Sequence, residues 1–160
     1  MKYTNNIQGW IAPDELQFLY DTAKDMKTIV EIGSYKGKST LALLQSGNKV
    51  IAIDHWLGSK GLTMKGNEYD EFIENTKGYD NLEVIIGDSI ISADKIDKVD
   101  MVFIDGDHTY EGVKRDINAW LPKTKFLCGH DYDLPEVKQA VDDAFKIDGL
   151  TGSIWWKNLK

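Results

Sequence analysis

The stretch from Thr28 to Thr40 constrains the fold of this chain more than any other. It starts as a short apolar run carrying a carboxylate, Glu31, continues through a turn with Gly33 and Gly37, and leads into a helical sequence. Glycine lacks a Cβ, so it lets backbone approach a ligand closely and adopts positive φ without strain. The free N–H groups of the helix start face the same point. The stretch therefore predicts a strand–turn–helix cradle for a small molecule.

The rest of the chain repeats this alternation of strand and helix. Strands are expected at 28–33, 49–54, 82–86, 99–104, 125–129 and 153–156, and helices at 13–26, 36–45, 68–77, 89–96, 109–120 and 134–147. Continuous apolar strands separated by helices predict an α/β, Rossmann-like doubly wound sheet of about six mostly parallel strands, with helices on both faces. We expect a single domain over 1–160, in which an N-terminal helical segment, 1–27, packs on the core.

Composition narrows the classes of partner. The formal net charge of −7 argues against nucleic acid, because a duplex binder needs clustered Lys and Arg. The sequence has no apolar signal region and no apolar run of membrane length, so we expect no membrane partner and a cytoplasmic location. The single cysteine, Cys128, lies in an apolar run and has no partner for an intrachain disulfide.

Ionisable residues stand at the ends of five predicted strands. In parallel sheets, ligands bind beyond the carboxyl ends of the strands. The rim formed by these ends carries Glu31, Asp54, Asp88, Asp105, His130 and Asp131. Their convergence on one edge of the sheet predicts a site there.

Two phosphate-binding motifs compete for the glycine turn. A dinucleotide fingerprint requires glycine where this chain has Tyr35, whose side chain would block the pyrophosphate. The sequence Gly37-Lys38-Ser39 matches the end of a P-loop, but the first P-loop glycine would fall on Ile32. Glu31 would also place a carboxylate beside the phosphates. The P-loop remains a rival, and a cationic nucleoside without phosphate suits the turn better.

At this point the chain resembles the class I S-adenosylmethionine-dependent methyltransferases. Residues 31–37 match their glycine motif, Asp54 their ribose-binding acidic residue, and 87–89 their adenine-side turn. The run 104–113, with Asp116 and His130-Asp131-Tyr132, narrows the resemblance to a small, methyltransferase 24-like family. That family is related to the cephalosporin-hydroxylase and macrolide-sugar O-methyltransferase groups. The resemblance also implies that the closing strand, near Trp155, runs antiparallel.

The resemblance implies roles for individual residues. Asp54 would accept the ribose hydroxyls, Glu31 would face the methionine end of the cofactor, and Asp88 and Ser89 would contact adenine. The full set expected to bind S-adenosylmethionine is Glu31, Gly33, Ser34, Tyr35, Gly37, Ser39, Asp54, His55, Trp56, Asp88, Ser89 and Asp105. Asp88 and Ser89 could instead cap a short helix, and Trp56 could be a core or lid residue.

Catalytic and metal roles are implied for the ends of the fourth and fifth strands. His108 is the first candidate for a general base, with His130 and Asp105 as further catalytic candidates. In the sugar O-methyltransferases, acidic residues at the positions of Asp105, His130 and Asp131 hold a divalent cation. Oxygen ligands suit Mg²⁺, whereas the histidine here leaves another divalent cation or no metal open.

The sequence thus predicts an S-adenosylmethionine-dependent methyltransferase that acts on a hydroxyl, or an amine, of a small molecule or sugar. The loop 55–67 would form a lid and part of the acceptor wall, and the short chain suggests a homo-oligomer in which a partner completes that wall. The alternatives are a cofactor- or nucleotide-binding module without catalysis and a P-loop-like NTPase.

Overall fold

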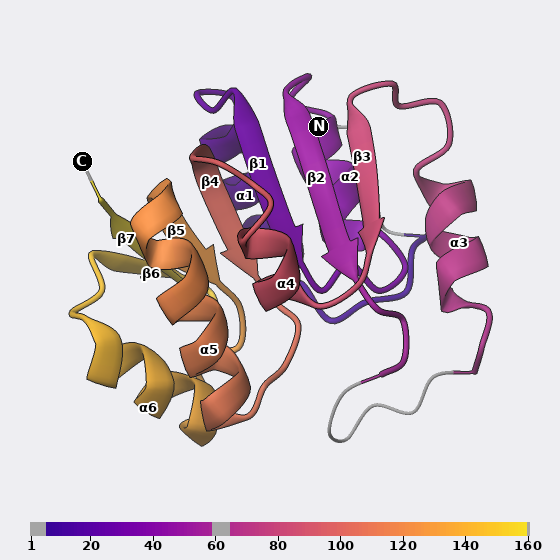
Figure 1. Cartoon of the computed structure of the whole chain (residues 1–160). Coiled ribbons are helices and arrows are strands. Elements are labelled where there is room, and N and C mark those ends of the chain that lie inside the picture. Colours follow the sequence, from indigo (N-terminus) through magenta and orange to yellow (C-terminus); the bar gives the residue numbers. More distant parts are fainter. Residues whose placement is uncertain (1–5, 59–64, 160) are drawn as a thin grey trace.

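The computed structural model describes residues 6–58 and 65–159. Over these ranges, seven strands form one sheet in the order β3-β2-β1-β4-β5-β7-β6 (Figure 1). The strands are β1 Thr28–Ile32, β2 Lys49–Asp54, β3 Leu82–Ile86, β4 Val99–Ile104, β5 Thr124–Gly129, β6 Gly149–Thr151 and β7 Ile154–Asn158. The first five run parallel to one another, as the alternation of strand and helix predicted.

Helices cover both faces of the sheet, which confirms the doubly wound architecture. In Figure 1, α1 and α2 lie behind the sheet, α4, α5 and α6 lie in front, and α3 stands beside the β3 edge. Their bounds are α1 Pro13–Ala23, α2 Lys38–Leu44, α3 Glu68–Asn75, α4 Ser89–Ala93, α5 Tyr110–Trp120, the 3₁₀ turn η1 Leu121–Lys123 and α6 Pro135–Ala144. The sixth helix is shorter than predicted, because the backbone of Phe145 is already extended.

Each buried strand supplies side chains to two cores. In β4, Val102 and Ile104 pack with α5 and α6 on one face, whereas Met101 and Phe103 pack with α1 and α2 on the other. Successive side chains of a strand point to opposite faces. An apolar run without alternation is therefore the sequence signature of a strand covered on both sides, and β4 shows it.

The strand order reverses between β1 and β4. The chain builds β2 and β3 on one side of β1, and then crosses back to place β4 and β5 on the other side. The two loops that leave β1 and β4 part at this switch point, which is where open α/β sheets bind ligands. The backbone N–H of Asp105 donates to the carbonyl of Ile32 (2.8 Å), which keeps the two strand ends together.

The C-terminal edge corrects one prediction and confirms another. We expected a single strand after the last helix, but β6 precedes β7 and makes a hairpin with it through Gly152, whose φ is +59°. A strand of three residues is too short to produce a periodic pattern, so the sequence did not reveal it. The strand β7 pairs antiparallel with β5, as predicted.

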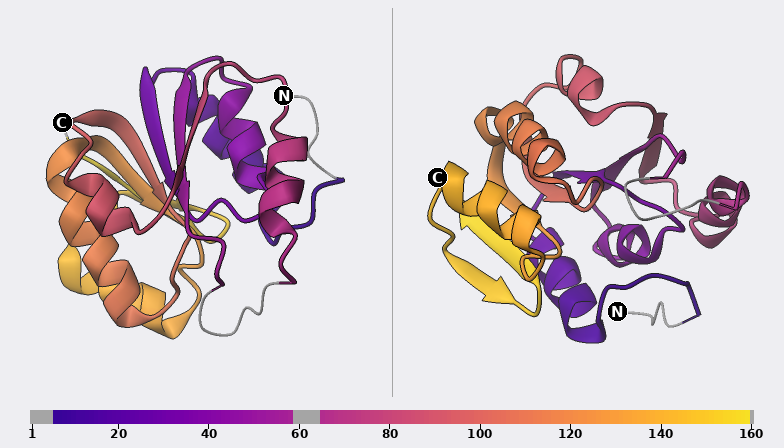
Figure 2. Two further views of the ribbon diagram at one scale, coloured as in Figure 1. Left: turned by 45° about the vertical axis from the view of Figure 1, so that its right-hand side comes forward. Right: turned by 90° about the horizontal axis from the view of Figure 1, so that it is seen from below.

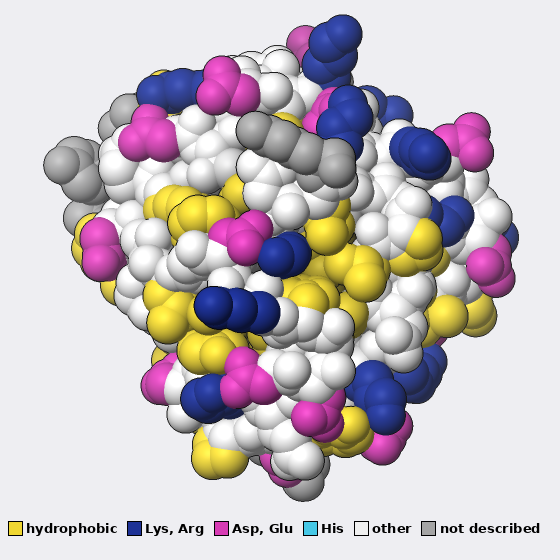
Figure 3. Space-filling model, turned by 90° about the vertical axis from the view of Figure 1, so that its left-hand side faces the viewer, with side chains coloured by type: hydrophobic (Ala, Val, Ile, Leu, Met, Phe, Trp, Pro, Cys, Tyr) yellow, Lys and Arg dark blue, Asp and Glu magenta, His cyan; other side chains and the backbone are white. Residues whose placement is uncertain are grey.

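The face of the molecule at this edge mixes apolar and charged side chains. Figure 3 shows apolar patches separated by Lys, Arg, Asp and Glu, so the apolar surface there is interrupted. In the part of the chain that the structure describes, no helix is both long enough and apolar enough to cross a membrane. Of the proposed lid, 59–64 lies outside the described residues.

Candidate active site

A cavity of about 600 Å³ opens at the carboxyl ends of the strands, at the switch point between β1 and β4. Its walls come from segments far apart in sequence, which Figure 2 shows meeting when the molecule is seen from below. Twelve of the predicted site residues line it: Gly33, Ser34, Tyr35, Ser39, Asp54, His55, Asp88, Ser89, Asp105, His108, His130 and Asp131. Three others do not, namely Glu31, Gly37 and Trp56.

The glycine turn is tightly packed against the end of β4. Gly33 has a φ of +83°, and a Cβ placed on it would lie 2.2 Å from the carbonyl oxygen of Asp105. Only glycine therefore allows the β1 and β4 loops to approach this closely. Tyr35 also has a positive φ, +47°, which is unusual for a residue with a side chain and holds its ring toward the cavity.

Asp54 ties this turn to the end of β2. Its Oδ2 accepts the backbone N–H groups of Ser34 and Tyr35, both at 2.9 Å, and its Oδ1 accepts that of Trp56 at 2.7 Å. A carboxylate has about four lone-pair directions, and three are occupied here, so one remains for a hydroxyl donor from the cavity side. The residue is thus both a structural brace and an acceptor at the cavity wall.

Glu31 lies beneath the turn and outside the cavity. It is fully buried, and its Oε2 accepts the hydroxyls of Ser34 and Thr40. Its Oε1 has no partner among the residues that the structure describes. Burial raises the pKa of Glu31 to about 7. The sequence placed this residue against the methionine end of a cofactor, whereas here it supports the turn from behind.

Trp56 and Gly37 belong to the packing of α3. The Trp56 ring contacts Tyr69 (centroids 4.8 Å apart) and Phe72 (5.1 Å), and its Nε1 donates to the carbonyl of Tyr35 at 2.7 Å. A Cβ on Gly37 would lie 3.2 Å from the Phe72 ring. The contacts of Trp56 are therefore those of a core residue, which was one of the alternatives that the sequence left open.

The third wall of the cavity is built by α4 and α5. Asp88 caps α4 by accepting the N–H groups of Ile90 (2.9 Å) and Ile91 (3.1 Å), and the Ser89 hydroxyl donates to Asp116. Burial raises the pKa of Asp116 to about 6. Asp116 was part of the family resemblance but was assigned no role, although an acidic residue on the buried face of α5, between Val113 and Trp120, was the signal that could have identified one.

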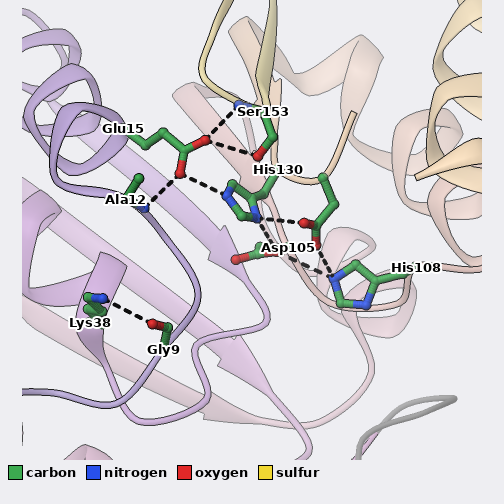
Figure 4. A network of polar contacts seen from close by, with 9 residues as sticks. Gly9, Ala12, Glu15, Lys38, Asp105, His108, His130 and Ser153 are labelled. Atoms are coloured by element: carbon green, nitrogen blue, oxygen red, sulfur yellow. Dashed lines mark hydrogen bonds and ion pairs between the residues drawn. The ribbon is translucent and has the colours of Figure 1, made fainter. Parts of the chain in front are cut away.

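Two imidazoles and three carboxylates form one cluster at the ends of β4 and β5. His108 Nε2 lies 2.9 Å from Asp131 Oδ2 and 3.5 Å from Asp105 Oδ1. His130 Nδ1 lies 3.2 Å from Asp131 Oδ1, and its Nε2 lies 3.1 Å from Oε2 of Glu15. Figure 4 shows Ser153 turned toward Glu15 and Glu15 turned toward His130, with Asp105 and His108 beyond it.

The charges in this cluster shift one another's pKa values. Hydrogen bonds to Asp105 and Asp131 raise the pKa of His108 to about 10. Burial alone would lower the pKa of His130, but Asp131, Asp105 and Glu15 outweigh it and raise that pKa to about 9. Burial would likewise raise the pKa of Asp131, but the two imidazoles hold it below its usual range. Both histidines are therefore cationic at neutral pH.

Among the residues that the structure describes, one set of side chains could serve as cation ligands. Asp105, His108 and Asp131 can each supply one ligand atom, and these atoms lie within 4.8 Å of one another. The set predicted from sequence had His130 in place of His108. His130 directs its Nε2 to Glu15, and its Nδ1 is 3.7 Å from Asp105.

The chain is similar in sequence to a known family and to two curated proteins. A family model described as a methyltransferase domain matches residues 30–132, nearly two thirds of the chain. The uncharacterized protein R132 of Acanthamoeba polyphaga mimivirus is 31% identical over 137 residues, which are 74% of this chain and 59% of that protein. The uncharacterized protein y4gI of Sinorhizobium fredii is 28% identical over 123 residues, which are 69% of this chain and 14% of that protein. The chain thus spans well under two thirds of both relatives.

Solved structures share the fold over almost the whole chain. Cofactor-bound Rv0187 from MTB superposes with a TM-score of 0.74 at 14% identity, covering 96% of this chain and 84% of that one. The O-methyltransferase from Bacillus cereus in complex with SAH superposes with a TM-score of 0.72 at 16% identity, covering 98% and 86%. At such low identity these matches describe the architecture alone.

Proposed function

The chain belongs to the methyltransferase domain family, and from that premise we propose that it transfers a methyl group from S-adenosylmethionine to a hydroxyl, or an amine, of a small molecule or sugar. The observation that carries the proposal is the cavity at the switch point, where the glycine turn, Asp54 and the Asp105 cluster face one space. The cofactor is a cation, and the carboxylates around this space favour a cation.

Asp54 is the residue that we assign to the cofactor's ribose. Its carboxylate is fixed by three backbone N–H groups, so its remaining lone pair has a set direction before any ligand arrives. Such preorganisation reduces the ordering that binding would otherwise require. On the same cavity we assign the adenine side to Ser89, Asp88 and Ile90, with Asp116 holding the Ser89 hydroxyl.

Glu31 would act on the cofactor indirectly, through the residues that it holds in place. Its carboxylate positions Ser34 and the first turn of α2 through two hydroxyl groups. Its unpartnered oxygen Oε1 and raised pKa describe a group whose ionised form is poorly satisfied in the ligand-free protein. A sulfonium nearby would favour that ionised form. We therefore assign Glu31 as a positioning and electrostatic residue rather than as a contact in the cavity.

When bound, S-adenosylmethionine supplies a methyl carbon to which the acceptor oxygen bonds as the carbon–sulfur bond breaks, leaving S-adenosylhomocysteine and one proton on the acceptor to be removed. Positioning provides most of the acceleration in such a displacement. Asp105 is the proton acceptor that we assign, because it lines the cavity and burial raises its pKa toward the range of a general base. His108 is protonated near neutral pH and would hold the Asp105 and Asp131 carboxylates in place.

The same side chains, Asp105, His108 and Asp131, could instead bind a divalent cation. Two carboxylates and one imidazole suit a transition-metal ion better than Mg²⁺, which prefers oxygen ligands. Asp105, His108 and Asp131 would hold it, and it would lower the pKa of an acceptor hydroxyl. The ion would compete with the His108 proton, so binding would release protons.

The contacts of the turn weigh against the P-loop alternative. A P-loop offers free backbone N–H groups to phosphate, but here the N–H groups of Ser34 and Tyr35 already donate to Asp54. A phosphate would also meet the carboxylates of Asp54 and Asp105 on the same cavity wall.

Calorimetry with S-adenosylhomocysteine, S-adenosylmethionine and ATP tests the proposal. We expect the first two to bind and ATP not to bind. ATP binding without S-adenosylhomocysteine binding would overturn it. Titration of metal-free protein with Mn²⁺ and Mg²⁺, with proton release measured, tests the cation separately. Cofactor binding without methyl transfer to any hydroxyl or amine acceptor would instead favour a binding module.

A further inference from the structure

Residues 8–11 form a strap that lines the cavity and is anchored to the start of α2. The side chain of Lys38 donates to the carbonyl of Gly9 at 3.0 Å, and Lys36 donates to Oε1 of Gln8 at 2.9 Å. A Cβ on Gly9 would lie 3.1 Å from the Lys38 side chain, so the strap lies close against it. At the other end, Ile11 is buried in the core. Figure 2 (right) shows this indigo segment passing beside α2 on its way into α1.

Trp10 lies between these anchors with its ring exposed. It is 68% exposed, although its neighbours in the chain are held in place, and it lines the cavity. Its ring centroid lies 5.5 Å from that of Tyr35, with the rings inclined by 36°. Tyr35 carries a positive φ, and its backbone N–H donates to Asp54. A fixed aromatic surface therefore stands beside the glycine turn, and most of it has no protein partner in the described part of the chain.

The charges of the cavity restrict what can stack there. Six carboxylates line it, namely Asp54, Asp88, Asp105, Asp107, Asp116 and Asp131. The Lys and Arg side chains on its walls already have partners: Lys36 pairs with Glu71 at 3.0 Å, Lys38 donates to Gly9, and Arg115 lies 3.7 Å from Asp88. The two cationic histidines on the walls also have partners, because His108 contacts Asp131 and His130 contacts Asp131 and Glu15. An anionic acceptor would therefore meet carboxylates, while the described cations of the cavity are already engaged.

We propose that Trp10 is the stacking surface for the methyl acceptor, and that the acceptor is an uncharged or cationic ring compound whose hydroxyl or amine reaches the Asp105 cluster. The proposal rests on the proposed function. The rim opposite the strap adds a second apolar contact, because Leu134, at the start of α6, lines the cavity and is partly exposed. Both an aromatic ring and the apolar face of a sugar ring present a flat surface of this kind to an indole.

Four small-molecule probes test the charge and the ring type of the acceptor. Their binding is measured on protein saturated with S-adenosylhomocysteine. p-Cresol, tyramine and p-hydroxybenzoate share a phenol hydroxyl and differ in charge, whereas methyl glucoside offers a sugar ring. Affinities are measured by ligand-observed NMR. We expect p-cresol and tyramine, or methyl glucoside, to bind, and p-hydroxybenzoate to bind at least tenfold more weakly than p-cresol. Binding of the phenols alone identifies an aromatic acceptor, and binding of the glucoside alone identifies a sugar.

Variants then test Trp10 itself. Trp10→Ala should lower the affinity for whichever probe binds by about tenfold, and Trp10→Phe should retain most of that affinity. Leu150→Ala, which removes a side chain that is 49% exposed on β6 and away from the cavity, should change nothing. All three variants should bind S-adenosylhomocysteine as the wild type does. The proposal is overturned if no probe binds, if p-cresol binds and p-hydroxybenzoate binds as well as it does, or if Trp10→Ala leaves probe affinity unchanged. Failure of S-adenosylhomocysteine to bind the wild type would instead remove the proposed function.

Discussion

Glu15 and His130 are 115 residues apart in the chain, yet Oε2 of Glu15 lies 3.1 Å from Nε2 of His130. The same carboxylate accepts the N–H of Ala12 (2.7 Å) and both the N–H (2.6 Å) and the hydroxyl (2.9 Å) of Ser153. One buried side chain in the first turn of α1 therefore fixes the β6–β7 turn and orients a histidine of the candidate site (Figure 4).

Glu15→Ala should lower the free energy of unfolding by about 3 kcal/mol, because it leaves a buried imidazole charge and several donors without their acceptor. Urea denaturation at pH 7 measures the loss. Asp14→Ala, in the same turn but exposed, is the matched control and should change stability by only a few tenths of a kcal/mol (~0.3). Equal losses in the two variants would contradict the role given to Glu15.

Gly33→Ala should be far more damaging than Gly47→Ala. Both glycines have nearly the same φ, +83° and +84°, so the strain of a side chain at positive φ is matched, at about 1 kcal/mol. A Cβ at Gly33 would also collide with the Asp105 carbonyl, whereas at Gly47 it meets nothing within 4 Å. The difference between the melting temperatures of the two variants measures the effect of the collision alone. If the two melting temperatures fall equally, the β1 and β4 loops are not locked together as described.

Asp54→Asn should weaken S-adenosylhomocysteine binding roughly 30-fold, equivalent to about 2 kcal/mol, because the hydrogen bond to a charged acceptor becomes a bond to a neutral amide. Calorimetry gives the affinity. Some stability is also lost, since Asp54 braces the turn, so the titration is run well below the unfolding temperature. Asp80→Asn, which removes a carboxylate elsewhere on the chain and outside the cavity, controls for net charge. Unchanged affinity in Asp54→Asn would remove the ribose assignment.

Glu31→Gln should change the pH dependence of stability in a defined direction. The folded-state pKa of Glu31 is raised to about 7, above an unfolded value of roughly 4.3, so the folded state keeps a proton that the unfolded state loses. This group therefore stabilises the fold at acid pH, and its contribution falls as the pH rises from about 4 to 7. The variant has no carboxyl to ionise, so relative to the wild type it should gain on the order of 3 kcal/mol over that interval.

Urea midpoints of Glu31→Gln and the wild type at pH 4.5 and pH 8 make the comparison. A constant difference between the two proteins would show that folding does not raise the pKa of Glu31. If the variant is at least as stable as the wild type at pH 8 but binds S-adenosylmethionine more weakly, the buried carboxylate serves binding rather than stability.

The stability that His108 contributes should be lost at alkaline pH. Its folded-state pKa is raised to about 10 by Asp105 and Asp131, so the stability that it contributes is fully present below about pH 6.5 and disappears as the pH rises toward 10. His108→Gln should therefore show a shallower decline in unfolding free energy between pH 7 and pH 10. His55→Gln, at a more exposed histidine, should decline as the wild type does. Parallel curves for all three proteins would contradict the assigned pKa.

The sequence by itself determined the order of strands and helices and the rim of ionisable residues. Both depend on local patterns: an apolar run without alternation marks a strand covered on both faces, and the carboxyl ends of parallel strands share one edge. Asp54, Asp105, His108 and Asp131 could therefore be placed on one cavity before any contact was known, and all four line it.

Only the tertiary structure decided which way individual side chains turn. Glu31 stands in the right motif but faces α2 rather than the cavity, and Trp56 packs on α3. The candidate set of cation ligands contains His108 with Asp105 and Asp131, whereas His130 contacts Glu15 through its Nε2. Neither Trp10 nor Glu15 was predicted to belong to the site. Trp10 is placed by contacts with the turn at Tyr35, and Glu15 by contacts with His130, 115 residues away. No periodicity within one segment can encode such contacts.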